Sequence, residues 1–232
     1  MSRAGGVDRP EPATPEDSPR GRRFRLSEDT MLDAACAVFA ADGFDAAKMD
    51  TIAAHAGTTK PTLYARFGAK DALFAAAVRR EHQLLNERVI AAYQGPDDEP
   101  FRQRLHRWIT AYFDFVRDRP DGFKLTFEGE RHAAAAAAIA EATNERVDAI
   151  AALISRVSGR RAGAGPRLVA AMIVGMFRWC AQEALARPNT DLANAAALCE
   201  SMLYPAITRL DADLMDTVTG GRRRRRATKP TS

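Results

Sequence analysis

The residues with the most evident chemistry lie in one short stretch, Gly57–Lys70, with the sequence GTTKPTLYARFGAK. It supplies three cations, Lys60, Arg66 and Lys70, and contains no acidic residue. Ammonium and guanidinium groups bind phosphate oxygens, and a guanidinium also pairs with the edge of guanine. The hydroxyl of Tyr64 can donate to a phosphate as well. The stretch therefore has the chemistry of nucleic-acid binding, provided that these side chains share an exposed surface.

A short helix over residues 60–67 meets that condition. One of the two threonines before it can cap it, and Pro61 is tolerated in the first turn, where a missing N–H has no intrahelical acceptor. At about 100° per residue, Leu63 and Phe67 fall roughly 40° apart and form the buried stripe. The opposite face consists of Pro61, Thr62, Ala65 and Arg66, flanked by Lys60 and Tyr64. That face is small and polar enough to reach base edges in the major groove.

Two helices are expected before this one. The first is capped by Ser27 and stopped by Gly43, and its inward residues at i, i+3, i+4 and i+7 are Leu32, Ala35, Cys36 and Phe39. The second spans about 49–56 and ends at Gly57. A helix, a glycine turn and a further short helix are the pattern of a helix-turn-helix. Lys70 then opens a longer helix, whose positive dipole end also favours a phosphate.

The rest of the chain is rich in alanine and shows no alternating strand pattern, so the predicted fold class is all-α with about nine helices. The further helices are expected at residues 70–93, 100–118, 120–129, 132–157, 166–187 and 190–210. Thr190 is expected to cap the last helix and Pro205 to kink it.

Both ends of the chain are polar and basic. Residues 1–25 carry six arginines against four acidic residues, and the tail from Gly221 carries five arginines and one lysine against none. Since the whole chain has a formal charge of +4, the part between these ends lies near −4. We expect solvated, disordered ends at 1–25 and 216–232. The alternative is that the Arg222–Arg226 run adds loose, salt-sensitive attraction to phosphates.

The composition favours a cytoplasmic protein. Three cysteines, Cys36, Cys180 and Cys199, lie far apart in apolar segments, which is typical of buried thiols in a reducing compartment. The polar N-terminus is no signal peptide, and the longest strongly apolar run, Leu168–Phe177, has only ten residues. We therefore expect a soluble protein, associated with the nucleoid and with no membrane partner.

A family resemblance becomes specific over Met31–Val78, which has the sequence MLDAACAVFAADGFDAAKMDTIAAHAGTTKPTLYARFGAKDALFAAAV. It resembles the N-terminal DNA-binding domain of the TetR family of bacterial transcriptional regulators. The shared features are DGF at the end of the first helix, IAxxAG in the second, LYxxF in the third and KDALF opening the fourth. The resemblance implies a helix-turn-helix domain at 26–72 and an effector-binding and dimerisation domain at 73–215, where only the helix layout is similar.

The resemblance further implies a nine-helix subunit that dimerises on a palindromic operator in double-stranded DNA and releases it when a small molecule binds. The family's DNA-facing positions correspond to Thr59, Lys60, Thr62, Tyr64, Arg66 and Lys70, and the outward face adds Pro61. Lys48 stands where a Ser or Thr usually caps the second helix; it keeps a phosphate contact but loses a cap of about 1 kcal/mol. Gly68 replaces a common proline and is expected to loosen the next link.

An effector pocket is expected in an aromatic-rich part of the second domain. Its walls would be Trp108, Tyr112, Phe113, Phe123 and Phe127, with Glu128, Arg131 and His132 as polar anchors. The ligand would be apolar or aromatic with one polar group. For any single aromatic residue, plain core packing is the favoured interpretation, and the pocket is expected here because a family that senses ligands needs a cavity in this area. No cofactor is expected.

A dimer interface is expected on the segment Arg167–Leu185, which is apolar nearly all round. Burial on every side requires more neighbours than one small subunit supplies, although a central core helix is the alternative. Together with the last helix, the interface residues would be Met172, Met176, Trp179, Cys199 and Met202.

Two other functions compete with that of a specific regulator. An enzyme has no support, because the chain contains no Walker loop, dinucleotide fingerprint, HExxH or CxxC. A metal pair of Glu128 and His132 lacks further ligands, so no metal site is expected. A basic protein that coats DNA without sequence choice is the second competing function. Repression is favoured over activation, because the family mostly occupies promoters.

Overall fold

The computed structural model describes residues 19–94, 98–159, 163–211, 215 and 218, without the side chains of 19–27 and 157. Within these ranges the chain is all-α, as the sequence predicts. Its elements are α1 (Pro19–Ala46), α2 (Met49–His55), α3 (Lys60–Phe67), α4 (Lys70–Tyr93), α5 (Phe101–Asp118), α6 (Pro120–Glu128), the 3-10 turn η2 (Gly129–Arg131), α7 (Ala133–Ser158), α8 (Ala164–Ala186) and α9 (Leu192–Thr208). Most of the predicted disordered ends, 1–25 and 216–232, lies outside the described residues.

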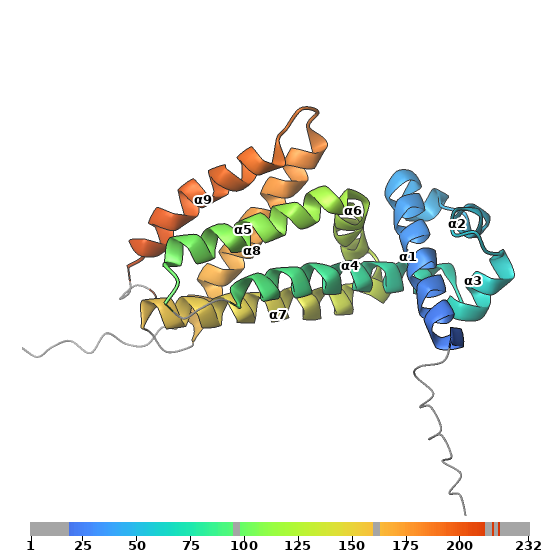
Figure 1. The fold of residues 1–232 in the computed structure, drawn as a ribbon, viewed down its shortest axis with the longest axis horizontal. Coiled ribbons are helices and arrows are strands. Elements are labelled where there is room, and N and C mark those ends of the chain that lie inside the picture. The colour runs from blue at the N-terminus through green and yellow to red at the C-terminus, as the bar shows by residue number, and fades with distance from the viewer. Residues whose placement is uncertain (1–18, 95–97, 160–162, 212–214, 216–217, 219–232) are drawn as a thin grey trace, which may run out of the picture.

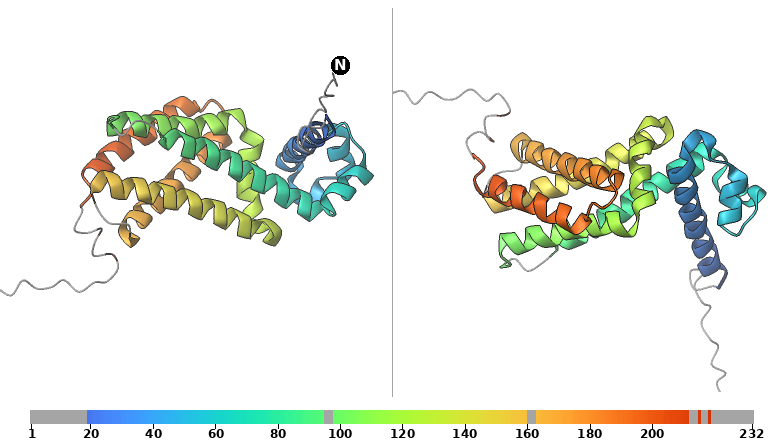
Figure 2. Two further views of the ribbon diagram at one scale, coloured as in Figure 1. Left: turned by 60° about the horizontal axis from the view of Figure 1, so that its bottom comes forward. Right: turned by 90° about the horizontal axis from the view of Figure 1, so that it is seen from above.

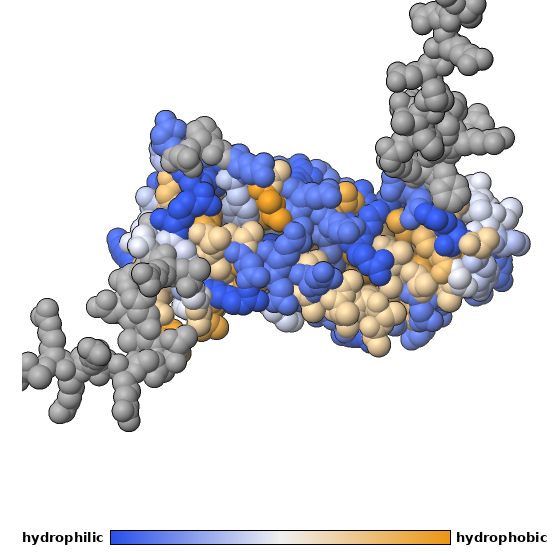
Figure 3. Space-filling view, turned by 90° about the horizontal axis from the view of Figure 1, so that it is seen from below, coloured by the Kyte–Doolittle hydropathy of each residue, from blue (hydrophilic) through white to orange (hydrophobic). Residues whose placement is uncertain are grey.

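The molecule is elongated, with a small head of α1, α2 and α3 at one end (Figure 1). The body is a bundle in which α4 packs beside α7, α5 contacts α4 and α9, and α8 packs on α7 and α9 (Figure 2). The face seen from below is mostly hydrophilic, with separate apolar patches, as expected of a surface in water (Figure 3). Since α4 runs from the head into the body, it joins the two parts.

Two predicted helix starts are wrong. α1 begins at Pro19, so Ser27 lies inside the helix and does not cap it. The arginine-rich residues before Ser27 are good helix formers, which explains the longer helix. α9 is capped by Asp191 in place of Thr190, because the Asp191 carboxylate accepts from the N–H of Ala193 at 2.8 Å. A carboxylate also favours the positive end of the helix dipole.

The head is closed by a small apolar core. The predicted stripe of α1 lies at its centre, with Ala35 and Phe39 fully buried, and Ile52 and Leu63 reach it from α2 and α3. Phe74 of α4 meets Phe39 edge-on at a ring distance of 5.0 Å. The same cluster continues into α6 and α7, while the next turns of α4 belong to the core of the body. Head and body are therefore packed together and not merely tethered.

A buried ionic network strengthens this junction. Glu81 of α4 is fully buried and accepts from the Nε of Arg119 at 2.7 Å and from Arg80 at 2.8 Å. Arg119 also donates to Asp33 of α1 at 2.8 Å. Burial raises the pKa of Glu81, but the hydrogen bonds from Arg119 and Arg80 outweigh burial and hold the pKa below its ordinary value. Gly122 makes room, since a Cβ there would lie 2.1 Å from Glu81 Oε2.

α8 differs from the sequence-based expectation. The ten-residue run inside it is too short to span a bilayer, yet the whole helix has the length and mean hydropathy of a membrane span, a test that core helices of soluble proteins also pass. It packs against α7 and α9, but only 39% of its most apolar window is buried. The described part of the chain leaves an apolar side of α8 uncovered.

Candidate functional site

The local sequence makes α3 a short, well-terminated helix. Thr59 is the N-cap, as predicted, and its Oγ1 accepts from the N–H of Thr62 at 3.4 Å and lies 2.8 Å from the Thr62 hydroxyl. Pro61 lies in the first turn, where no N–H is needed. Gly68 ends the helix with a φ of +78° and donates to the carbonyl of Tyr64 at 2.8 Å. Proline can adopt neither that φ nor that hydrogen bond, so glycine here sets the turn.

The outward face of α3 is exposed as the helical wheel predicts. Leu63 is fully buried and Phe67 half-buried, while the predicted contact residues on the far side are open to solvent. Tyr64 keeps 42% of its surface exposed although it is a large aromatic residue. The exposed predicted residues are Lys48, Thr59, Lys60, Pro61, Thr62, Tyr64 and Arg66; Lys70 is half-buried. The helix therefore presents one continuous polar surface.

Two acids outside the stretch hold its cations. Lys60 donates to Asp50 of α2 at 2.9 Å, and this hydrogen bond raises the pKa of Lys60. Arg66 forms an ion pair with Glu28 of α1. The sequence interpretation missed both acids, because they come from neighbouring helices. Exposed ion pairs of this kind contribute little free energy, so phosphates can replace the carboxylates.

Lys70 and Lys48 lie at the N-termini of α4 and α2. Lys70 donates to the carbonyl of Asp45 at 3.1 Å, and its Nζ lies 4.7 Å from the centroid of the Phe44 ring. At the start of α4 the N-cap is Ala69, whose side chain caps no N–H. Lys48 is the N-cap of α2 without a side-chain cap, as predicted. Both helices thus keep N-terminal N–H groups that their cap side chains do not bind.

Four of the eight predicted pocket residues come together. Phe123, Phe127, Glu128 and Arg131 line a cavity of about 320 Å³, completed by residues of α6 and α8 and called here the Phe127 pocket. Burial raises the pKa of the Glu128 carboxyl. The pocket has apolar walls and polar groups of both signs, which fits the predicted ligand chemistry.

The other four residues lie elsewhere. Trp108 is buried between the rings of Tyr93 and Phe177, at 5.2 and 5.0 Å, and belongs to the core. Phe113 is buried and borders a groove between α5 and α9. Tyr112 lines a separate inner cavity. On α5 the aromatic residues face the core because α8 places Phe177 against them, which the periodicity of α5 alone cannot reveal.

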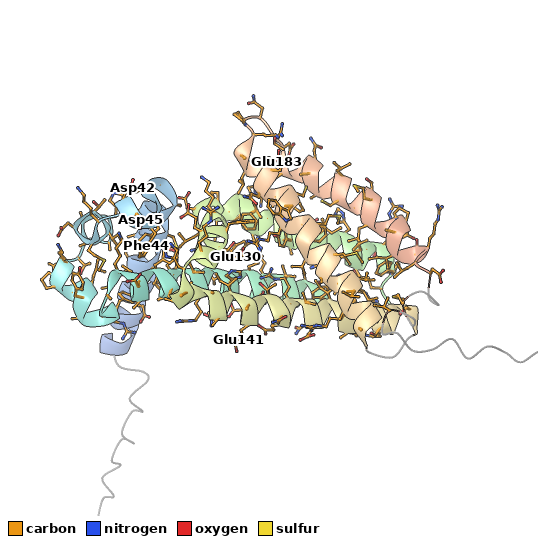
Figure 4. All side chains as sticks on the ribbon, turned by 180° about the vertical axis from the view of Figure 1, so that it is seen from behind. Asp42, Phe44, Asp45, Glu130, Glu141 and Glu183 are labelled. Carbon is orange, nitrogen blue, oxygen red and sulfur yellow. The ribbon has the colours of Figure 1, made fainter. Side chains whose placement is uncertain are left out.

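His132, predicted as a pocket anchor, lies at the junction of head and body. Its ring contacts Phe44 at 4.2 Å and Phe74 at 4.7 Å between centroids. Figure 4 shows Phe44 in the head and Glu130 in the body on either side of this junction. Since His132 directly follows Arg131 of the Phe127 pocket, a pocket residue is bonded to the residue that contacts the head.

Sequence reasoning missed a second polar cluster inside the body. Arg146 of α7 is buried and its Nε donates to Asn86 of α4 at 2.8 Å, beside a buried His82. Burial, and then the charge of Arg146, lower the pKa of His82 to about 3, so this histidine is neutral. A signal was present: Arg146 lies four residues before Ile150, in the inward stripe of its helix.

The predicted dimer residues divide into two groups. Met172, Trp179 and Met202 are exposed by 65%, 67% and 59%, and the sequence analysis missed Leu168 and Leu198, which are exposed beside them on α8 and α9. Met176 is half-buried against the body core. Cys199 is buried within the subunit, its Sγ 3.5 Å from that of Cys180, so it faces inward. Large apolar side chains seldom gather in water without a partner.

The described residues contain no cluster of three or more His, Cys, Asp or Glu side chains that could hold a metal ion. Glu128 lines the Phe127 pocket, whereas the ring of His132 packs against phenylalanines at the junction. Glu128 and His132 thus have separate surroundings and do not form a pair.

Comparisons with known proteins agree with this geometry. The family described as bacterial regulatory proteins, tetR family, matches residues 31–77. The HTH-type transcriptional activator FasR of Mycolicibacterium smegmatis is 38% identical over 147 residues, which are 62% of this chain and 66% of that protein. The HTH-type transcriptional repressor SCO4008 of Streptomyces coelicolor is 31% identical over 97 residues, 42% of this chain and 46% of that protein. The chain thus spans less than two thirds of either relative.

The fold is similar to a solved structure as well. A TetR-like transcriptional regulator from Rhodococcus sp. RHA1 matches with a TM-score of 0.66 and 28% identity, over 79% of this chain and 97% of that one. Its match extends through the body, where the sequence resemblance alone gave only a helix layout. By its helix-turn-helix head, its relatives and its fold, the chain belongs to the TetR family of bacterial regulatory proteins.

Proposed function

We propose that this protein is a transcriptional regulator that binds a palindromic operator as a homodimer. Its affinity for the operator changes when a small molecule binds. The observation that carries the proposal is the outward face of α3. Thr62, Tyr64 and Arg66 lie on this face and are exposed, with Arg66 held by its ion pair with Glu28 of α1. Their side chains offer a hydroxyl, a phenol and a guanidinium to phosphates and base edges.

A second copy of the chain is the partner that best fits α8 and α9. Leu168, Met172 and Trp179 follow one another along one side of α8, and Leu198 and Met202 add the adjoining side of α9. A two-fold pairing of these faces buries both sets at once and doubles the number of α3 helices. Two such helices match the two half-sites of a palindrome.

The effector part of the proposal rests on the position of the Phe127 pocket. Arg131 lines it, and the next residue, His132, packs against Phe44 and Phe74. Phe44 in turn lies under the ammonium of Lys70, a predicted phosphate contact. A ligand that moves η2 therefore shifts groups at the DNA-binding surface without any long-range relay.

The direction of regulation follows from where the operator lies. Repression is our first proposal, since a dimer on a promoter excludes other proteins, and SCO4008 is named a repressor. Activation is the second candidate, favoured by FasR, a relative of higher identity that is named an activator. In vitro transcription from the operator-bearing promoter distinguishes them, because the protein then lowers or raises the yield of transcript. We place the protein in the cytoplasm on the nucleoid, away from the membrane.

Sequencing of DNA bound to the full chain in the source genome tests the proposal. The expected result is one enriched palindrome whose half-site centres lie about 10 base pairs apart or a multiple of that spacing. A protein that binds all sequences alike through its basic ends gives no enriched motif, and that result contradicts the proposal. The Arg222–Arg226 run lies outside the described residues.

A further inference from the structure

A second cavity lies deeper in the body than the Phe127 pocket. It has a volume of about 190 Å³ and is lined by residues of α4, α5, α6, α7 and α8, Arg146 among them. We call it the Arg146 cavity. Phe123 borders both this cavity and the Phe127 pocket, so the two are neighbours.

Arg146 is a buried cation without a carboxylate at hand. Only 5% of it is exposed, and within the described ranges no acid lies at ion-pair distance from its guanidinium. Its Nε donates to Asn86 at 2.8 Å, and a terminal nitrogen lies 3.5 Å from Nδ1 of His82. The adjacent acid, Glu145, accepts from the amide of Asn86 at 3.0 Å instead. Asn86 thus lies between the guanidinium of Arg146 and the carboxylate of Glu145.

The other groups of the cavity do not balance this charge. His82 is buried and neutral, and its Nε2 has no hydrogen-bond partner among the described residues. Arg178 adds a second cation, but it is paired with Glu130 and stacks over Phe127 at 4.4 Å. One positive charge therefore remains uncompensated. Burying such a charge is costly unless it is paired, and burial lowers the pKa of Arg146 accordingly.

We propose that the Arg146 cavity binds the carboxylate of a small organic acid, which acts as an effector of this regulator in addition to the ligand of the neighbouring Phe127 pocket. A guanidinium fork fits a carboxylate with two parallel hydrogen bonds, and a monoanion matches the single uncompensated charge. The remaining walls, including Phe123, Val147 and Val174, suit an apolar remainder of the acid. The effector role rests on the proposed function; the anion site itself does not.

The two cavities differ in the balance of charge among their lining residues. The Phe127 pocket already contains Glu128 beside Lys124 and Arg131, and it is bordered by exposed residues, so its charges are balanced and solvated. The Arg146 cavity is lined by a cation that is only 5% exposed and has no carboxylate at ion-pair distance among the described residues. Its volume also limits the ligand: a cavity of about 150 Å³ accommodates benzene, so about 190 Å³ suits an acid the size of benzoate or hexanoate.

Thermal unfolding of the full chain tests the site with named probes. Benzoate and the straight-chain acids from acetate to octanoate are compared with benzamide and hexanamide, which have similar shapes and no charge. We expect the acids of matching size to raise the Tm by roughly 5 °C or more at about 100 times their Kd, and the amides to leave it unchanged. If no acid raises the Tm, or if the amides raise it equally, the proposal is overturned.

Two variants locate the effect. Arg146→Met removes the charge and is expected to abolish the shift, while Arg146→Lys keeps the charge without the fork and is expected to retain a smaller shift. Arg156→Met, at an exposed position of the same helix, is the matched control and should respond like the parent chain. Helical circular dichroism verifies folding. A full acid-induced shift in folded Arg146→Met or Arg146→Lys shows that the acid binds elsewhere and overturns the proposal.

An operator titration then tests the effector role. The acid that raises the Tm most is expected to change the operator Kd at least fivefold, since coupling between two sites is reciprocal. A Tm rise without any change in operator Kd contradicts the effector role. If the protein binds no specific DNA at all, the proposed function fails, while the Tm series still decides the anion site by itself.

Discussion

The cations of the head and those of the body have opposite environments. Lys60 and Arg66 lie on the surface of the helix-turn-helix and pair with exposed or half-exposed acids. Arg119 lies at the junction and Arg146 in the interior, and each donates to a buried side chain, Glu81 and Asn86 respectively. Surface pairs are exchanged at little cost, whereas buried pairs fix the structure. The comparison shows that the number of arginines in a chain does not indicate their roles unless the burial of each arginine is known.

The largest expected effect comes from breaking the buried network. Glu81→Gln leaves Arg80 and Arg119 without their shared carboxylate in a fully buried position. Because Asp33 still compensates part of the charge, we expect a loss of about 3 kcal/mol in the free energy of unfolding. Denaturation by urea measures it. Glu87→Gln, exposed on the same helix, should change stability by less than about 0.5 kcal/mol.

The same network predicts a pH dependence. The pKa of Glu81 is held below its ordinary value of 4.5 in the folded protein, so its contribution is present above pH 4.5 and is lost as the pH falls through the folded pKa. Asp33, whose pKa is also lowered, acts in the same direction. Unfolding measured from pH 7 to pH 3 should show stability falling at the acid end. An equally steep fall in Glu81→Gln would assign the effect to other groups.

Arg66→Ala is expected to act on DNA and not on folding. If Arg66 contacts a base, its loss weakens operator binding by about 1–3 kcal/mol and relaxes the choice of base at one position. Since its ion pair with Glu28 is on the surface, stability should change by less than about 0.5 kcal/mol. Titration of operator variants at that position measures both aspects. Unchanged selectivity would leave Arg66 a phosphate contact only.

Tyr64→Phe tests whether the hydroxyl of Tyr64 contacts a phosphate or a base. Removing an exposed hydroxyl that binds phosphate should cost about 1 kcal/mol on every sequence alike. Parallel titrations of operator and random DNA test this, and the ratio of the two Kd values should stay constant. A loss confined to the operator would move Tyr64 to the base-contacting set.

The smallest effect is expected from the acids that hold the cations. Glu28→Gln releases Arg66 from its ion pair and removes a negative charge near the DNA-binding surface. We expect a few-fold gain in affinity at low salt that fades as the ionic strength rises. Glu141→Gln, exposed on α7 in the body, is the control and should leave the affinity unchanged. If Glu28→Gln and Glu141→Gln change the affinity equally, Glu28 has no specific effect on DNA binding.

The local sequence predicted the head well because its determinants are local. A threonine cap, a proline in the first turn and the stripe at Leu63 act within one helix, so the exposed face of α3 follows from spacing alone. The partners Glu28 and Asp50 could not be predicted, because α1 and α2 bring them from other parts of the chain.

The body was predicted less well because its cavities depend on packing. The direction of Trp108 and Tyr112 is decided by Phe177 on a helix far along the chain. Likewise, the environment of Arg146 is set by Asn86 and His82 of α4, which only the folded chain brings next to it. Helix ranges follow from periodicity, whereas the space between helices does not.

The central claim is that the open face of α3, doubled by a second subunit, selects a DNA sequence. The most direct test is the Kd of the full chain for its enriched palindrome and for a scrambled duplex of equal length, at about 0.15 M salt, with the mass of the complex determined in parallel. The account predicts two subunits per site and a preference of about 10³ or more for the palindrome. Equal affinities for the two duplexes, or a single subunit on the palindrome, would contradict it.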